Sequence, residues 1–282
     1  MGSGWQEWPL VLFTVLGQCM AGGLIVTGLA WFTGHQNDRA RIVRVMFFLW
    51  VLMGIAFLAS VMHLGSPLRA FNSLNRLGHS PLSNEIASGS LFFAVGGLWW
   101  LLAVLGKMPT ALGKAWLIVA MALGVVFIFA MTRVYQIDTV PTWHNGYTTL
   151  GFFLTALLGG PLLGALLLAA AGMATPRTCA VVAVLALVIS LAAALMQTAS
   201  LAGIHSTVQQ ASALLPDYGF WQAWRMALLA IGIGCWLCPL VRRVPPRPWG
   251  LMAGFALVLV GELIGRGLFY GLHMTVGMAV AG

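Results

Sequence analysis

Three charged residues, Glu85, Glu262 and Arg266, lie inside or at the mouth of apolar segments long enough to cross a lipid bilayer. A charge in the hydrocarbon core costs roughly 2.5–3.5 kcal/mol even on the mildest insertion scales, so it is usually kept for a structural or chemical role. The chain has only six acidic residues, and two of them occupy these costly positions. We therefore expect the chemistry of this protein around them.

His63 and Glu85 flank one polar connection, at the end of one apolar segment and near the start of the next. Oxidation of a quinol needs a hydrogen-bond partner for its oxygens and a base that takes protons as the electrons leave. A neutral histidine can provide the first, and a partly desolvated carboxylate can provide the second. The alternative for Glu85 is purely structural, because the helix dipole favours an acid near a helix N-terminus. The sequence leaves both interpretations open.

Glu262 and Arg266 are four residues apart in one apolar segment, in the order that favours an ion pair along a helix. We therefore expect them to form a structural ion pair within the bilayer. The alternative function is a secondary transporter that uses these two charges near the membrane midplane. A transporter should have interrupted helices and polar groups at that depth in both halves. Here the polar groups gather at one face, which disfavours transport.

The composition is that of a membrane protein. The chain has 282 residues, of which 60% are hydrophobic and 7% charged, with a mean hydropathy of +0.94. Segments of about 20 apolar residues, the length that crosses a hydrocarbon core, recur along its whole length. They predict an all-α integral membrane protein, a single polytopic domain over residues 1–282 with eight transmembrane helices. The predicted spans are 9–32, 43–64, 84–106, 115–136, 150–171, 179–201, 220–241 and 249–274.

Lys and Arg concentrate in the connections that follow the odd-numbered spans, for example Arg39, Lys107 and Arg242. By the positive-inside rule these connections are cytoplasmic, which predicts that both termini are periplasmic. This pattern accounts for the net charge of +8, so no nucleic-acid partner is expected. The opposite connections are longer, more polar and rich in histidine. Long polar connections favour a functional face, although ordinary solvated loops are the alternative.

A faint internal repeat has an offset near 140 residues. Arg133 and Tyr135 near the end of the fourth span parallel Arg266 and Tyr270 in the eighth. Because the repeated unit has an even number of spans, it predicts two four-helix halves in the same orientation, about an axis along the membrane normal. Composition bias is the alternative explanation.

The cysteines and histidines do not predict a metal site. Cys235 and Cys238 form an isolated Cys-x-x-Cys pair within a span, without a second pair or a histidine cluster. A two-haem path across the membrane needs histidine pairs near both surfaces, whereas the cytoplasmic side has only His35. We therefore expect no metal, haem or iron–sulfur cluster of its own. A single haem held by His63 and His205 is the alternative left open.

Several strings closely resemble the anchor subunit of bacterial dimethyl sulfoxide reductase, and the resemblance runs along the whole chain. The strings are HLGSPLRAFNSLNR at 63–76, LSNEIASGS at 82–90, IDTVPTW at 137–143, GELIGR at 261–266 and FYGLHM at 269–274. The resemblance implies a bacterial inner-membrane protein that anchors an iron–sulfur electron-transfer subunit and a molybdopterin catalytic subunit. A paralogue linked to selenate-type reductases is similar as well, so the terminal acceptor stays open.

The resemblance also implies a reaction. The protein would bind and oxidise menaquinol near the periplasmic face and pass the electrons to the iron–sulfur subunit. The family's quinol site is attributed to a histidine and a glutamate that match His63 and Glu85, with Glu85 the expected proton acceptor and Arg69 beside them. The polar connection between the second and third spans is expected to dock the iron–sulfur subunit. The docking residues expected there are Arg69, Asn72, Asn75 and Arg76.

Overall fold

The computed structural model describes residues 3–63, 72, 74–204 and 210–275. Eight of its helical segments are long and apolar enough to cross a membrane, and no strand occurs in these ranges. The predicted all-α membrane fold is therefore confirmed. The helices are α1 (Trp8–Thr33), α2 (Gln36–Val45), α3 (Phe47–His63), α4 (Pro81–Val104), α5 (Thr110–Val134), α6 (Gly146–Ala170), α7 (Arg177–Leu201), α8 (Tyr218–Val241) and α9 (Pro248–Gly271), with short 3-10 turns η1 (Ser3–Trp5) and η3 (Ala211–Ala213).

The connection between the first two predicted spans, residues 33–42, is mostly helical. It forms α2, and the chain turns at Met46 into α3. Arg41 pairs with Asp38 at 2.6 Å on the exposed side of α2, while Ile42 is fully buried on the other side. Because α2 is amphipathic and lies at the end of the bundle, it has no long apolar run from which it could be predicted.

Local capping chemistry sets several helix ends. Ser80 precedes α4 and its hydroxyl accepts a hydrogen bond from the Ser83 amide at 3.5 Å, and Asn145 accepts one from the Thr148 amide at 3.2 Å at the start of α6. Gly172 follows α6 with a φ of +70°, a conformation that a residue with a side chain adopts only under strain. All eight spans begin and end within about five residues of their predicted limits.

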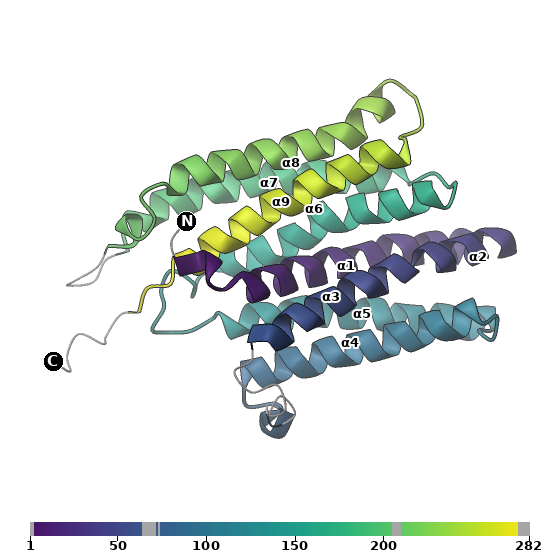
Figure 1. Cartoon of the computed structure of the whole chain (residues 1–282), viewed down its shortest axis with the longest axis horizontal. Coiled ribbons are helices and arrows are strands. Elements are labelled where there is room, and N and C mark those ends of the chain that lie inside the picture. The colour runs from purple at the N-terminus through teal and green to yellow at the C-terminus, as the bar shows by residue number, and fades with distance from the viewer. Residues whose placement is uncertain (1–2, 64–71, 73, 205–209, 276–282) are drawn as a thin grey trace.

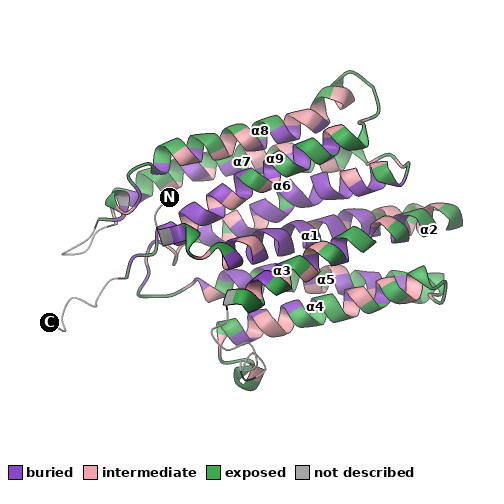
Figure 2. Ribbon diagram, viewed as in Figure 1, coloured by how far each residue is buried: buried purple, intermediate pink, exposed green. Residues whose placement is uncertain are grey.

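The helices form two halves of four spans, as the internal repeat predicts. One half contains α1, α3, α4 and α5, and the other contains α6, α7, α8 and α9 (Figure 1). The corresponding helices α1 and α6 pack against each other at the centre, and α4 packs on α5 as α8 packs on α9. Most residues of the central helices α1 and α6 are buried, whereas most residues of α4 and α8 are only partly buried or exposed (Figure 2).

The central interface depends on the small size of its residues. A methyl group placed on Gly160 of α6 would lie 2.5 Å from the Cα atom of Gly22 in α1, so the two backbones touch. The α8–α9 pair repeats this contact, since a methyl group on Gly232 would lie 2.7 Å from the Gly254 carbonyl oxygen. Such close approach is how membrane helices gain packing energy when lipid is as apolar as their side chains.

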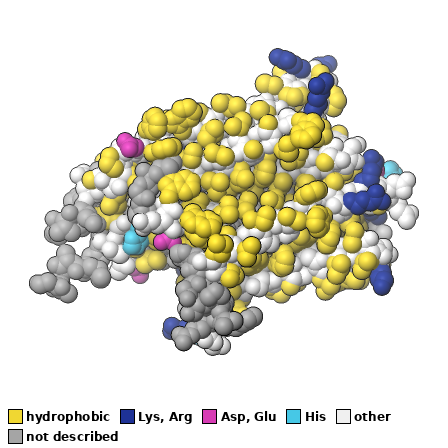
Figure 3. All heavy atoms as spheres, in the orientation of Figure 1, with side chains coloured by type: hydrophobic (Ala, Val, Ile, Leu, Met, Phe, Trp, Pro, Cys, Tyr) yellow, Lys and Arg dark blue, Asp and Glu magenta, His cyan; other side chains and the backbone are white. Residues whose placement is uncertain are grey.

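The two ends of the bundle differ in charge. The start of α1 and the end of α9 lie at one end, which we call the terminal end, and Lys and Arg side chains gather at the opposite end, which we call the basic end (Figures 1 and 3). Between the ends, the visible surface is a continuous apolar band (Figure 3). This band is the surface expected to face lipid.

Candidate functional site

Glu85 is buried at the terminal end of the bundle. It is the fifth residue of α4 and only 5% of its surface is exposed. The stabilising effect of the helix dipole falls off within the first turn, and that turn of α4 contains no acidic residue. The purely structural interpretation of Glu85 is therefore weakened, because the dipole does not offset the cost of its burial.

The surroundings of Glu85 are aromatic and hydroxylated. The buried phenols of Tyr135, just after α5, and Tyr270 in α9 lie near it. In the part of the chain that the structure describes, its carboxylate accepts no hydrogen bond. A buried acceptor without a protein partner is suited to a ligand that brings a hydroxyl group.

The other predicted quinol-site residues are described less fully. His63 is the last residue of α3, at the same end of the bundle as the start of α4, but its side chain lies outside the described residues, as does the whole of Arg69. Asn72, Asn75 and Arg76 are exposed between α3 and α4. Asn72, Asn75 and Arg76 thus lie beside the start of α4, while their docking role and the contact between His63 and Glu85 stay predictions.

Tyr135 and Tyr270 join the two halves of the protein at this end. Their hydroxyl oxygens are 2.5 Å apart, and both side chains are buried. Trp143 packs edge-on against Tyr135 and donates from its indole to the Phe269 carbonyl oxygen at 2.8 Å. The site prediction did not include the tyrosines, although the internal repeat marks them as equivalent positions.

A cavity of about 380 Å³ adjoins the tyrosine pair. Phenol, imidazole, amide and carboxylate groups line it together with an indole, so it offers donors and acceptors within aromatic walls. This mixture fits an aromatic ring that carries oxygen substituents. The lining residues are Gln6, Glu7, Leu10, Val134, Tyr135, Ile137, Trp143, Tyr270 and His273.

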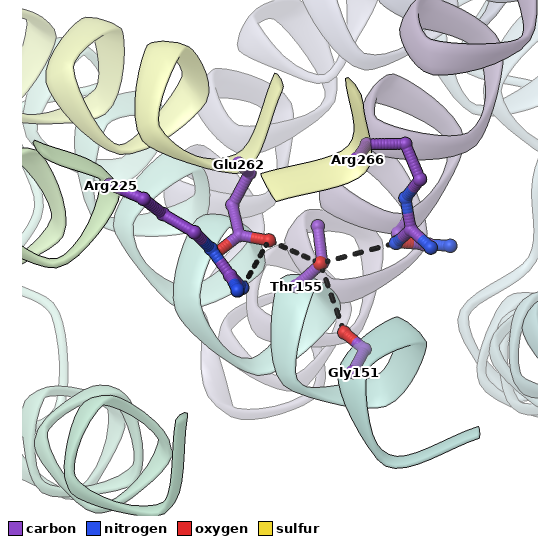
Figure 4. A network of polar contacts seen from close by, with 6 residues as sticks. Gly151, Thr155, Arg225, Glu262 and Arg266 are labelled. Carbon is purple, nitrogen blue, oxygen red and sulfur yellow. Dashed lines mark hydrogen bonds and ion pairs between the residues drawn. The ribbon is translucent and has the colours of Figure 1, made fainter. Parts of the chain in front are cut away.

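A second polar cluster lies deeper, where α1, α6, α8 and α9 meet (Figure 4). Arg225 donates to the Glu262 carboxylate at 3.1 Å, and the Thr155 hydroxyl donates to the other oxygen of Glu262 at 2.5 Å. Arg266 donates to Gln18 at 2.9 Å and to the Thr155 hydroxyl at 3.4 Å. The chain Arg225–Glu262–Thr155–Arg266–Gln18, here called the buried network, thus connects both halves.

The prediction that Glu262 forms an ion pair with Arg266 is wrong. The ion-pair partner of Glu262 is Arg225 of α8. The reason lies in the packing of α8 on α9. Gly265 leaves room for the arginine, since a methyl group there would lie 2.4 Å from the Arg225 Nε atom. The guanidinium of Arg266 instead stacks over the Phe152 ring at 3.5 Å, a cation–π contact that helps to offset its burial.

The geometry of the buried network does not suit a transport pathway. The cavity beside it measures only about 60 Å³, which is room for a few water molecules. Apart from the turn at Met46 between α2 and α3, each of the eight spans is a continuous helix, including α6 and α8, which contain Pro161 and Pro239. The charged network residues also belong to the second half alone, on α8 and α9, whereas a transporter should have such groups in both halves.

Within the described ranges, no three His, Cys, Asp or Glu side chains come together as metal ligands. Cys19, Cys179, Cys235 and Cys238 are all free thiols.

Comparison with known proteins finds extensive similarity. The sequence profile of a family described as "DMSO reductase anchor subunit (DmsC)" matches residues 1–272. Two Escherichia coli K12 proteins, both named as chains of anaerobic dimethyl sulfoxide reductase, are similar along their whole length. YnfH is 66% identical to this protein, and the other is 59% identical. An anaerobic dimethyl sulfoxide reductase chain from Haemophilus influenzae Rd is 43% identical. All three alignments cover the whole of both proteins.

Proposed function

This chain belongs to the family of dimethyl sulfoxide reductase anchor subunits, and we propose that it oxidises menaquinol at the terminal end of its first half. It is a multi-pass protein of the bacterial inner membrane with eight spanning helices. The observation that carries the proposal is Glu85, a carboxylate buried beyond the first turn of α4 with no hydrogen-bond donor among the described residues.

The proposed reaction divides two tasks between two residues. Menaquinol supplies two electrons and two protons when it is oxidised. Glu85 accepts a proton from one quinol oxygen, and His63 holds the ring by a hydrogen bond to an oxygen. Arg69 is proposed to lie at the same site. The protons are released at the surface from which α4 begins, and the electrons leave the protein at that surface.

The terminal end is proposed to be periplasmic, with both chain termini there. The basic end then faces the cytoplasm, in agreement with the positive-inside rule. Proton release and electron transfer both occur on the periplasmic side in this arrangement. We therefore infer that turnover by this subunit moves no net charge across the bilayer.

The partner that receives the electrons is proposed to be an iron–sulfur subunit, which in turn carries a molybdopterin catalytic subunit. The names of the relatives, as chains of a reductase, support such an assembly. Asn72, Asn75 and Arg76 present exposed amide and guanidinium groups beside the start of α4. With Arg69, they form the proposed docking surface, next to the site where electrons are released.

Menaquinol-dependent turnover of the assembled complex tests the proposal. Glu85→Gln keeps the size of the side chain but removes the base, so turnover should fall about 10²–10⁴-fold. His63→Phe should weaken quinol binding more than it harms assembly. Reduction of the catalytic subunit by a soluble dye donor, which bypasses the membrane subunit, should be unchanged in both variants. Near-normal quinol turnover by assembled Glu85→Gln complex would show that Glu85 is not the base.

A further inference from the structure

Two neighbouring cavities at the basic end share the same two arginines. One, of about 560 Å³, lies between the ends of α6 and α8 and the connections around them. The other, of about 430 Å³, is a groove between α7 and α8. Arg177, Leu240 and Arg243 line both cavities, so the arginines stand at the boundary between them.

The two cavities differ in chemical character. Apart from the arginines, the α7–α8 groove is lined only by Ala, Val and Leu side chains, including Val181, Leu185 and Val241. The other cavity includes Thr175 and the backbone of the bent connection that passes through Gly172. A ligand that fills both must therefore be amphipathic.

Arg177 and Arg243 are unpaired within the described ranges. Among the described residues, neither guanidinium forms a hydrogen bond or an ion pair, and both side chains are exposed. Arg243 is held just beyond α8 by a left-handed backbone, with φ at +56°. Asp38 is the one acidic residue at this end, and it is bonded to Arg41. The two arginines thus provide a positive charge that no group of the described residues neutralises.

We propose that this pair of cavities is a binding site for an anionic glycerophospholipid. Arg177 and Arg243 hold the phosphate, the headgroup occupies the more polar cavity, and an acyl chain lies in the α7–α8 groove. Guanidinium groups suit this role because they bind phosphate oxygens through charge-assisted hydrogen bonds. Basic pockets between transmembrane helices recognise lipid headgroups by this chemistry.

The groove faces the lipid, which favours a lipid over a soluble anion. Val181 and Leu185 are each 56% exposed and Val241 is 81% exposed, although all three are apolar. From Arg177 to Leu185 the groove runs for roughly 12 Å along α7, from the charged end into the hydrocarbon region. In a bound lipid, the acyl chain would extend from the phosphate in this direction and fill the groove. A free phosphate ion has no apolar part that could occupy the groove.

Native mass spectrometry of the purified full-length chain in mild detergent tests the site. After delipidation, the protein is titrated with phosphatidylglycerol, cardiolipin or phosphatidylethanolamine. Each arginine near a membrane surface contributes about fivefold in affinity for an anionic lipid, so Arg177→Gln/Arg243→Gln should weaken binding of the two anionic lipids roughly 25-fold. Arg242→Gln/Arg247→Gln removes the same charge at the same end but from residues that line neither cavity, and should bind like the wild type.

A second variant tests the groove without changing charge. Val181→Trp fills the groove at a lipid-exposed position and should lower phosphatidylglycerol occupancy while both arginines remain. Equal loss in both double variants would show a non-specific effect of charge and overturn the site. Equal binding of phosphatidylethanolamine, or wild-type binding by Val181→Trp, would also overturn it. Displacement of the lipid by equimolar inorganic phosphate would show a soluble-anion site instead.

Discussion

Removing the charge of Glu262 should destabilise the protein more than removing the charge of Arg225. The buried network holds one carboxylate between two guanidinium groups, with Arg225 at 3.1 Å and Arg266 linked through Thr155. Glu262→Gln leaves both arginines in the core without a counter-charge. Arg225→Met leaves one carboxylate and one guanidinium, which Thr155 still bridges. The two substitutions break the same ion pair but leave different charges behind.

The expected magnitudes follow from burial. Glu262 is 2% exposed, and removal of one partner from a buried pair costs about 3–5 kcal/mol because the other charge stays behind. The Arg225 side chain is 14% exposed, so its loss should cost about 1.5–3 kcal/mol, the range for a hydrogen bond to a charged group. The double variant should cost less than the sum of the two, with a coupling of roughly 0.5–3 kcal/mol.

Equilibrium denaturation in mixed detergent micelles measures these differences, with the fluorescence of the 12 tryptophans as the signal. Asp138→Asn is the matched control, because its side chain is 94% exposed and the substitution should leave stability unchanged. Additive single and double variants, or a larger cost for Arg225→Met than for Glu262→Gln, would refute the assignment of Arg225 as the partner of Glu262.

Four further outcomes are expected. In vesicles, both the wild-type complex and folded Glu262→Gln complex should oxidise menaquinol without moving net charge across the membrane. A membrane potential generated during turnover by either complex would contradict the electroneutral scheme. Arg69→Glu/Arg76→Glu should release the iron–sulfur and catalytic subunits from washed membranes, and normal subunit stoichiometry there would place docking elsewhere. Gly160→Leu should lower the melting temperature by forcing α1 and α6 apart, whereas Gly97→Leu should not, because a Cβ atom added at Gly97 meets no atom within 4 Å. Tyr135→Phe removes the hydroxyl that bonds to the Tyr270 hydroxyl and should destabilise the protein by about 1–3 kcal/mol. Additional Tyr270→Phe should recover part of this loss.

The residue types alone determine the membrane architecture. A helix must satisfy its own backbone hydrogen bonds in lipid, so apolar runs of about 20 residues predict spanning helices whatever their tertiary contacts. The same logic identifies Glu85 and Glu262 as costly and therefore informative, because depth in the bilayer follows from position along a span. Hydropathy did not predict the amphipathic helix α2, because this helix is polar and is buried only through its contacts with α1, α3, α4 and α6.

The partners of the buried charges were decided by tertiary structure. Along α9, the spacing of Glu262 and Arg266 permits an ion pair, but Arg225 from α8, 37 residues away, occupies the space that Gly265 leaves open. Tyr135 and Tyr270 likewise meet across 135 residues because the two halves come together at the terminal end. Spacing along one helix determines which side chains share a face. Which of them bond depends on the neighbouring helix, and that follows from the packing of small residues between helices far apart in sequence.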